Sequence, residues 1–176
     1  MRTTVLVLAS ITLALLLGSG AALLNAVKPA EATFSGKNGK IAFQSDRGSN
    51  YEIYTMTRNG KKIAKLTANP ADDEDPAFSP NGKRIAFISD RSGDSDIYTM
   101  NADRTKRAKI DRLTSDPADD EDPAFSPDGK KIAFESDRSG SSDIYKMNAD
   151  GTKLLRLTND PATTFGADWA GGPGSG

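Results

Sequence analysis

The sequence of 176 residues contains no cysteine and no histidine, and it has a single tryptophan. Without cysteine the chain has no disulfide, no catalytic thiolate and no sulfur ligand for a metal. Without histidine it lacks the commonest general base and the usual zinc ligand, and a Ser-His-Asp triad is excluded. Because only carboxylates, Lys, Tyr and Ser remain for catalysis, we predict that the protein is not an enzyme.

The charges are balanced, with 23 Lys and Arg against 24 Asp and Glu. Both signs are interspersed along the chain, so no basic stripe for nucleic acid and no polybasic patch for a membrane surface is expected.

The first 32 residues have the three parts of a secretory signal peptide. Arg2 supplies a positive start, residues 5–17 are predominantly apolar, and Ala30-Glu31-Ala32 forms an A-x-A cleavage pattern. We therefore predict an exported protein that is periplasmic, on the cell surface or extracellular. An alternative is an uncleaved anchor, because residues 5–27 carry no charge and would reach ~34 Å as a helix, enough to span a bilayer.

The rest of the chain aligns with itself. We predict a repeat domain over 33–170 with units 34–77, 78–124 and 125–168, followed by a flexible tail at 171–176. Phe34, Phe78 and Phe125 open the units, and Trp169 occupies the same position in an unfinished fourth one. Each unit repeats four patterns in the same order: Ile-Ala-Phe (41–43, 85–87, 132–134), Ser-Asp-Arg (45–47, 89–91, 136–138), an acid before Ile-Tyr (52–54, 96–98, 143–145) and Leu-Thr (66–67, 113–114, 157–158).

Each unit is predicted to form four short strands and no helix. In the second unit we expect strands at 76–79, 84–89 and 96–100 and a fourth that ends at Leu113-Thr114, with a Pro-Asn-Gly turn at 80–82. The second strand is apolar on both faces, which suits a sheet covered on both sides. Four strands in about 44 residues, repeated, are typical of a β-propeller blade.

The third unit shows a family resemblance most clearly. Phe-Ser-Pro-Asp-Gly-Lys-Lys-Ile-Ala-Phe at 125–134, Ser-Asp-Arg at 136–138, Asp-Ile-Tyr at 143–145 and Asn-Ala-Asp-Gly-Thr at 148–152 resemble the WD40-like propeller repeat of the TolB family. The resemblance implies a non-catalytic module for protein–protein binding or scaffolding in the cell envelope. It also implies partners such as a peptidoglycan-associated lipoprotein or other envelope proteins.

The number of blades is small. About three four-stranded blades are expected, whereas propellers close with about four to eight. The alternatives are a partial propeller and one half of a six-bladed ring formed by a homodimer. The C-terminal strand at 167–169 is a candidate to complete the N-terminal blade.

Two acidic clusters at equivalent positions of successive repeat units are the candidate functional residues. They precede the first strand of the second and third units, and we expect them in loops at one mouth of the central channel: Asp72, Asp73, Glu74 and Asp75, with Asp119, Asp120, Glu121 and Asp122. Converging there, they could bind a hard cation such as Ca²⁺ or a basic partner surface, and the alternative is that they are solvated connectors. A Ca²⁺- or carbohydrate-binding surface protein is the second functional hypothesis, and a metal-dependent propeller hydrolase the third.

The Ser-Asp-Arg triplets are interpreted as structural. We expect the Asp and the Arg of each triplet to pair with each other and with backbone N–H groups of their own turn.

Overall fold

The computed structural model describes residues 39–103, 109–159 and 162–170, all of which belong to one compact unit, Phe34–Gly176. The predicted signal peptide at 1–32, the segment around Phe34 and the tail at 171–176 lie outside the described residues. The described chain forms eleven strands: β1 (Lys40–Ser45), β2 (Glu52–Thr57), β3 (Ala64–Lys65), β4 (Asp73–Phe78), β5 (Arg84–Ser89), β6 (Asp96–Asn101), β7 (Ile110–Arg112), β8 (Asp120–Phe125), β9 (Lys131–Ser136), β10 (Asp143–Asn148) and β11 (Leu155–Arg156).

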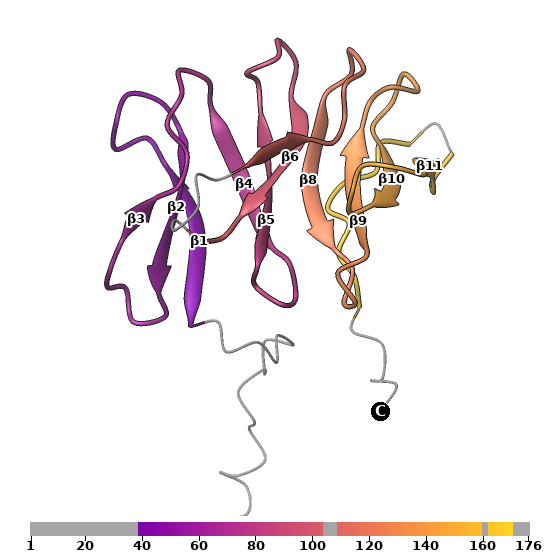
Figure 1. The fold of residues 1–176 in the computed structure, drawn as a ribbon. Helices are drawn as coiled ribbons and strands as arrows, with labels where there is room; N and C mark the ends of the chain where they lie inside the picture. Colours follow the sequence, from indigo (N-terminus) through magenta and orange to yellow (C-terminus); the bar gives the residue numbers. More distant parts are fainter. Residues whose placement is uncertain (1–38, 104–108, 160–161, 171–176) are drawn as a thin grey trace, which may run out of the picture. The chain divides into compact units, whose positions relative to one another are not determined.

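The strands form three antiparallel sheets in chain order, which Figure 1 shows one beside the next. Blade 1 is β1-β2-β3, blade 2 is β4-β5-β6-β7 and blade 3 is β8-β9-β10-β11. The predicted all-β partial propeller with about three blades is therefore confirmed. No helix occurs in the described part of the chain, and among those residues nothing helical could cross a membrane.

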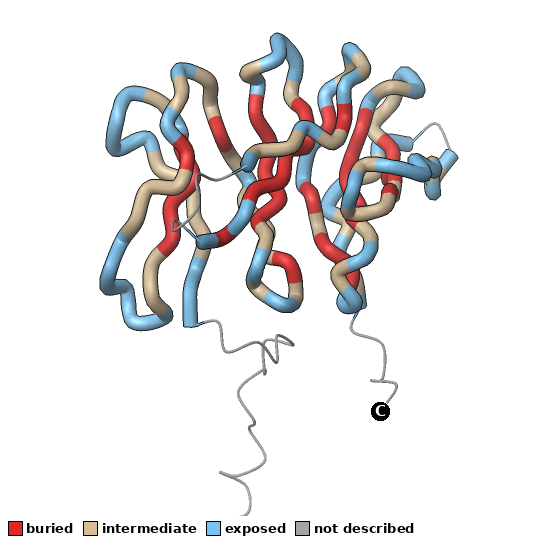
Figure 2. The backbone as a smooth tube through the Cα atoms, in the orientation of Figure 1, coloured by how far each residue is buried: buried red, intermediate tan, exposed pale blue. Residues whose placement is uncertain are grey.

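The core lies between the blades rather than inside any one of them. One buried cluster joins blades 1 and 2 and contains Ile53 with Ile85, Phe87, Tyr98, Met100 and Ala102. The other joins blades 2 and 3 and contains Ala86, Ile88 and Ile97 with Phe125, Ile132, Phe134, Tyr145 and Met147. Figure 2 shows the buried positions running along β5, β6 and β9. The second strand of each unit is apolar on both faces because each face covers a different neighbour.

The innermost strands begin earlier than the sequence predicted. β4 and β8 start at Asp73 and Asp120, so most of each acidic cluster lies in a strand and the predicted loop position is wrong for these residues. A register shift between Glu74 and Ala77, repeated between Glu121 and Ala124, marks a β-bulge in each strand. The bulge accommodates the proline after the acids. A residue that is not paired with the neighbouring strand does not have to donate a backbone N–H, which proline lacks.

The Leu-Thr pairs follow the fourth strands instead of belonging to them, since β7 ends at Arg112. The Thr114 hydroxyl accepts the backbone N–H of Ile97 at 2.9 Å and donates to Asp96 at 3.2 Å. Thr67 and Thr158 accept the N–H groups of the equivalent residues in blades 1 and 3 at 2.9 Å. Each threonine thus accepts a backbone N–H of the neighbouring strand at a point that the short outermost strand does not reach. The leucine before each threonine lies on the side of the next blade.

A buried acid at the start of β2, β6 and β10 forms an ion pair with a cation on the next strand of the same blade, β3, β7 and β11. The pairs are Glu52–Lys65 at 2.9 Å, Asp96–Arg112 at 2.6 Å and Asp143–Arg156 at 2.5 Å. All three acids are almost completely buried, and a buried charge needs such a partner. The outer edge of every blade is therefore fixed by the same ionic contact.

The C-terminal segment does not complete blade 1 in this chain. The Trp169 indole donates to the Ala124 carbonyl of β8 at 3.1 Å, and among the described residues β1 pairs only with β2. The expectation that residues 167–169 close the first blade is wrong because the segment continues the repeat beside blade 3.

Replacing Thr114 by valine tests the role of the threonine hydroxyl. Thr114→Val keeps the side-chain shape but leaves the buried Ile97 N–H without its acceptor, so we expect a loss of about 1–3 kcal/mol in unfolding free energy by urea denaturation. Thr163, which is exposed, provides the control, because Thr163→Val should change stability by less than about 0.5 kcal/mol. Equal effects of the two substitutions would contradict this role.

Candidate functional site

The innermost strands line a groove of about 650 Å³. β4 and β8 contribute Asp-Pro-Ala at 75–77 and 122–124, β1 bounds one side with residues 42–44, and residues 166–168 bound the other. Alanine and proline form much of this lining, and Asp75, Asp122, Asp168 and Gln44 supply its polar groups. Among the residues that the structure describes, no Lys or Arg lines it. The groove therefore has an acidic character that the balanced composition of the chain does not reveal.

The bulge directs one acid of each cluster to the groove. Asp75 and Asp122 adopt positive φ values of 47° and 49°, a conformation that Asp tolerates better than most residues. Gly166, at the same phase of the unfinished fourth unit, has φ 69°. The backbone geometry of the inner strand thus repeats a third time, but a glycine replaces the carboxylate there.

The second acid of each cluster is buried and paired. Asp73 and Asp120 are fully buried and lie 2.7 Å from Arg91 and 2.6 Å from Arg138. Asn69 also donates to Asp73 at 2.7 Å. Burial raises the pKa of Asp120, while hydrogen bonds from Ser136, Arg138 and Thr114 oppose that rise. The prediction that all eight carboxylates converge on the channel is wrong, because these two stabilise the interior of the blades.

Each arginine of a Ser-Asp-Arg triplet lies over two aromatic rings. The Arg91 guanidinium is 5.6 Å from the centroid of Phe87 and 4.7 Å from that of Tyr98, and its Nε donates to Ser89 at 2.9 Å. Arg138 repeats this arrangement over Phe134 and Tyr145, and Arg47 lies over Phe43 and Tyr54 in blade 1. Arg47 has no carboxylate partner among the described residues.

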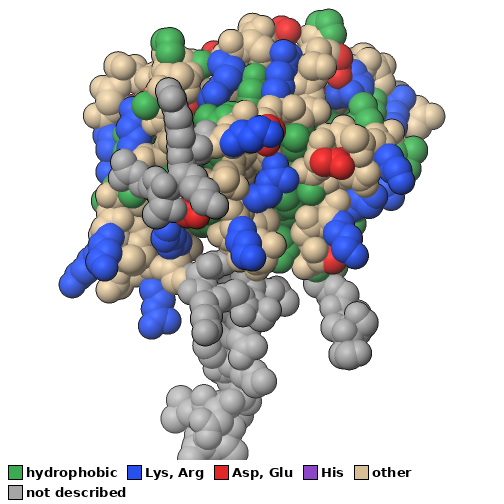
Figure 3. Space-filling model, viewed as in Figure 1, with side chains coloured by type: hydrophobic (Ala, Val, Ile, Leu, Met, Phe, Trp, Pro, Cys, Tyr) green, Lys and Arg blue, Asp and Glu red, His purple; other side chains and the backbone are tan. Residues whose placement is uncertain are grey.

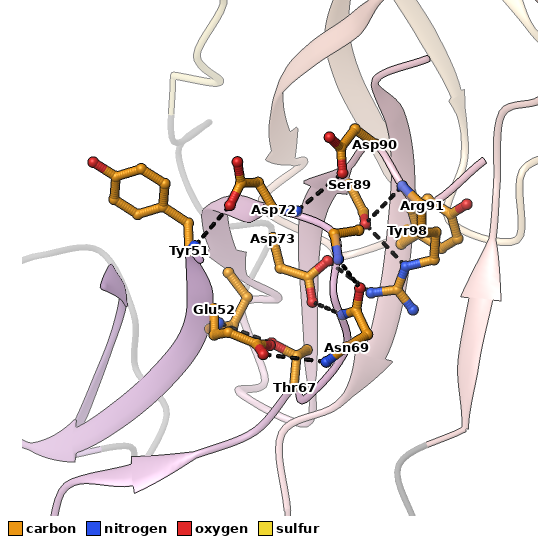
Figure 4. A network of polar contacts seen from close by, with 12 residues as sticks. Tyr51, Glu52, Thr67, Asn69, Asp72, Asp73, Ser89, Asp90, Arg91 and Tyr98 are labelled. Atoms are coloured by element: carbon orange, nitrogen blue, oxygen red, sulfur yellow. Dashed lines mark hydrogen bonds and ion pairs between the residues drawn. The ribbon is translucent and has the colours of Figure 1, made fainter. Parts of the chain in front are cut away.

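The first acid of each cluster accepts a backbone hydrogen bond from the preceding blade. Asp72 accepts the N–H of Tyr51 at 2.7 Å, and Asp119 accepts that of Ser95 at 3.1 Å. The N–H groups of Asp72 and Asp119 in turn donate to the aspartates of the following triplets, Asp90 and Asp137. Figure 4 shows this network around Asp72 and Asp73.

The triplets are therefore structural as expected, but their predicted pairing is wrong. Arg91 pairs with Asp73 of the preceding strand rather than with Asp90, and Asp90 accepts an N–H from the acidic cluster rather than from its own turn. The triplet contacts the acidic cluster because β4, which carries the cluster, pairs with β5, at whose end the triplet lies.

Several acids in or near the groove have pKa values above the ordinary range of carboxyl groups. Desolvation raises the pKa of Asp75, and the charge of Asp122 raises it further. Desolvation also raises the pKa values of Glu74, Glu121 and Glu135, each of which has other acids nearby. Glu135 was not among the predicted site residues. Its only signal in the sequence is that an acid stands where the second unit has Ile88.

Two of these groups are held by contacts with β1 and with residue 166. Gln44 of β1 donates to Glu74 at 3.1 Å and accepts the N–H of Asp75 at 2.8 Å. Glu135 accepts the N–H of Gly166. Of the eight predicted acids, the structure therefore places Asp75 and Asp122 in the groove lining and Asp72, Asp73, Asp119 and Asp120 in structural contacts, whereas Glu74 and Glu121 do not line the groove. In the described part of the chain, no group of three or more acids is arranged to hold a metal ion, so the structure adds no support to the Ca²⁺ hypothesis.

A family model described as the TolB beta propeller domain matches the chain twice, over residues 24–111 and 75–172. The two matches together span most of the chain. No curated protein matches the sequence.

Solved structures of the same fold include two TolB proteins. TolB from Acinetobacter baumannii is 30% identical, with a TM-score of 0.62, and the match covers 71% of this chain and 31% of that one. A protein assigned as a TolB from Agrobacterium tumefaciens is 24% identical, with a TM-score of 0.62, and the match covers 68% of this chain and 45% of that one. A puromycin hydrolase shares the fold at 14% identity and a TM-score of 0.57, with 70% and 22% covered. The chain thus spans less than half the length of each of these proteins.

Replacing the triplet arginine by alanine is predicted to lower the unfolding free energy more in blade 2 than in blade 1. Arg91→Ala leaves Asp73 buried with only Asn69 as a partner, so we expect a loss of about 3 kcal/mol in unfolding free energy. Arg47→Ala removes a cation over two rings at an exposed site and should cost about 0.5–1 kcal/mol. Chemical denaturation of both variants measures the difference, and similar losses would contradict the role given to the buried pair.

The raised pKa values predict that stability increases on mild acidification. A carboxyl group with a higher pKa in the folded chain than in the unfolded one binds its proton more tightly when folded, so folding becomes more favourable as the pH falls through that folded pKa. We expect the melting temperature to rise as the pH falls from neutral to the upper end of the ordinary carboxyl range. The double variant Asp75→Asn/Asp122→Asn should be more stable than the wild type at neutral pH and show a smaller rise. A wild-type melting temperature that falls throughout this interval would contradict the prediction.

Proposed function

Because the chain belongs to the TolB β-propeller domain family, we propose that it acts as an exported, non-catalytic module that binds a protein partner in the cell envelope. The signal-peptide pattern of residues 1–32 supports export. The observation that carries the binding proposal is the groove along β4 and β8, whose lining in the described part of the chain includes three carboxylates and no Lys or Arg.

The proposed ligand is an extended, basic segment of a partner protein. The apolar lining from Pro76, Ala77, Pro123 and Ala124 offers contact area to a peptide backbone and aliphatic stems. Asp75 and Asp122 are exposed to the groove and offer acceptors to Lys or Arg head groups. Electrostatic complementarity of this kind favours fast and selective association.

The groove lining is more acidic than the molecule as a whole. Figure 3 shows many Lys and Arg side chains on one face of the molecule, with few Asp and Glu among them. The net charge is only −1, so attraction of a basic segment depends on where the carboxylates lie rather than on their number. An envelope protein, such as a peptidoglycan-associated lipoprotein, is the partner class that we propose from the family.

The non-catalytic part of the proposal is supported by the residue types in the groove. Its lining contains no Ser, Lys or Tyr, so among the described residues no nucleophile of these kinds lines it. The likeness to a puromycin hydrolase concerns the propeller fold alone.

Binding of model peptides tests the proposal. A fluorescent peptide of alternating lysine and alanine should bind the wild type, and a peptide with glutamate in place of lysine should not. Asp75→Asn/Asp122→Asn should weaken binding of the lysine peptide roughly tenfold, about 1.4 kcal/mol. Raising the ionic strength should weaken it as well.

Asp94→Asn/Asp103→Asn is the matched control, because it removes the same charge from exposed sites outside the groove lining. Fluorescence anisotropy should give the control variant a wild-type affinity. Equal losses in both double variants would show an effect of net charge and refute the groove as the binding site.

A further inference from the structure

In the described part of the chain the stack of three blades has two open ends, and each end presents half of an interface that already exists between the blades. Blade 2 receives blade 1 on one side through a buried cluster, and it packs against blade 3 on the other through a second one. We call the side of a blade that faces its predecessor the leading face, and the side that faces its successor the trailing face. Among the described residues nothing plays the part of a predecessor to blade 1 or of a complete successor to blade 3.

The leading face of blade 1 is apolar and exposed. In blade 2, Ile85 of β5 is completely buried, and Ile110 of β7 packs against the same cluster. Their equivalents in blade 1, Ile41 and Ile63, are 42% and 49% exposed. The repeat therefore places the same side chains on both leading faces, but Ile41 and Ile63 are exposed in blade 1 whereas their equivalents in blade 2 are covered, and Tyr54 on the same face of blade 1 is buried.

The trailing face of blade 3 is partly exposed, although Ala133 and Ile144 on it are buried. Leu66 and Leu113 precede the equivalent threonines of blades 1 and 2, and both leucines pack against the clusters between the blades. Leu157 stands at the same phase in blade 3 and is 48% exposed. Phe165 in the adjoining segment is 71% exposed. Exposed apolar side chains gathered at a blade face are a mark of an interaction surface.

We infer that the trailing face of blade 3 packs against the leading face of blade 1 of a second copy of this chain, and that two such contacts close one ring of six blades. A second copy fits because it carries both faces, and because the contact would continue an interface that the chain already forms twice between its own blades. Two copies related by a two-fold axis satisfy both open ends at once. Six blades lie within the range in which propellers close, whereas three do not.

The ring would also complete the groove. β1 and residues 166–168 bound the groove on its two sides, and these are the segments next to the two open ends. The partner copy would add its own inner strands, so that Asp75 and Asp122 of both copies would line one central channel. The inference stands independently of the ligand proposed above, because it rests on apolar faces and not on the carboxylates.

Light scattering of the purified full chain tests the inference. The wild type should have twice the mass of one chain, which is 18.7 kDa. Ile41→Lys and Leu157→Asp each place a charge in both contacts of a homodimer, so each variant alone should dissociate at least tenfold more readily. Mixing the two variants should restore dimers, because one of the two contacts is then unaltered and the other pairs the Lys with the Asp.

Tyr51→Asp is the control, since Tyr51 is 39% exposed but donates its N–H to Asp72 at the boundary of blades 1 and 2. This variant should remain a dimer. Circular dichroism should show all variants folded, because Ile41 and Leu157 are exposed in the single chain. A monomeric wild type, dimers that persist in both single variants, or a mixture that stays monomeric would each overturn the inference.

Discussion

Blades 2 and 3 depend on one repeated contact, the ion pair between a buried aspartate of the innermost strand and an arginine that lies over two aromatic rings. In blade 2 the pair is Asp73 and Arg91, and the rings are Phe87 and Tyr98. The arginine thereby links β4, β5 and β6 through a single side chain. Removing the arginine would leave the aspartate charge buried without its cation, and the cost of an uncompensated buried charge is large compared with the stability of a small domain. The contact therefore constrains which residues can occupy the inner strand.

This constraint gives three of the four positions in each acidic cluster a different role. The first acid accepts an N–H from the preceding blade, the second pairs with the arginine, and the fourth lies in a β-bulge and faces the groove. The structural acids hold the strand in place, and the bulge then exposes the last carboxylate. The groove is thus acidic because of the same backbone geometry that forms the blade.

Much of the fold follows from the sequence, because the repeat phase, the turn residues and the apolar pattern of the second strands are all local signals. The three blades, the predicted second and third strands and the structural role of the triplets were obtained in this way. The partner of Arg91 was not, because Asp73 and Asp90 are equally plausible neighbours until the register of β4 against β5 is known. The bulge was also missed, since Asp-Pro alone predicts a strand start at the proline. Glu135 could not be assigned to the groove for a similar reason, because its neighbours Gly166 and Asp122 are distant in the sequence.

The central claim is that Asp73 and Arg91 act as one unit inside the blade while the acids at the groove are free to bind. A double-mutant cycle of Asp73→Asn, Arg91→Ala and their combination measures this coupling directly from unfolding free energies. The account predicts that the two losses are strongly non-additive, with a coupling energy of about 2–3 kcal/mol. A coupling energy below about 0.5 kcal/mol, the level at which independent sites add, would contradict it.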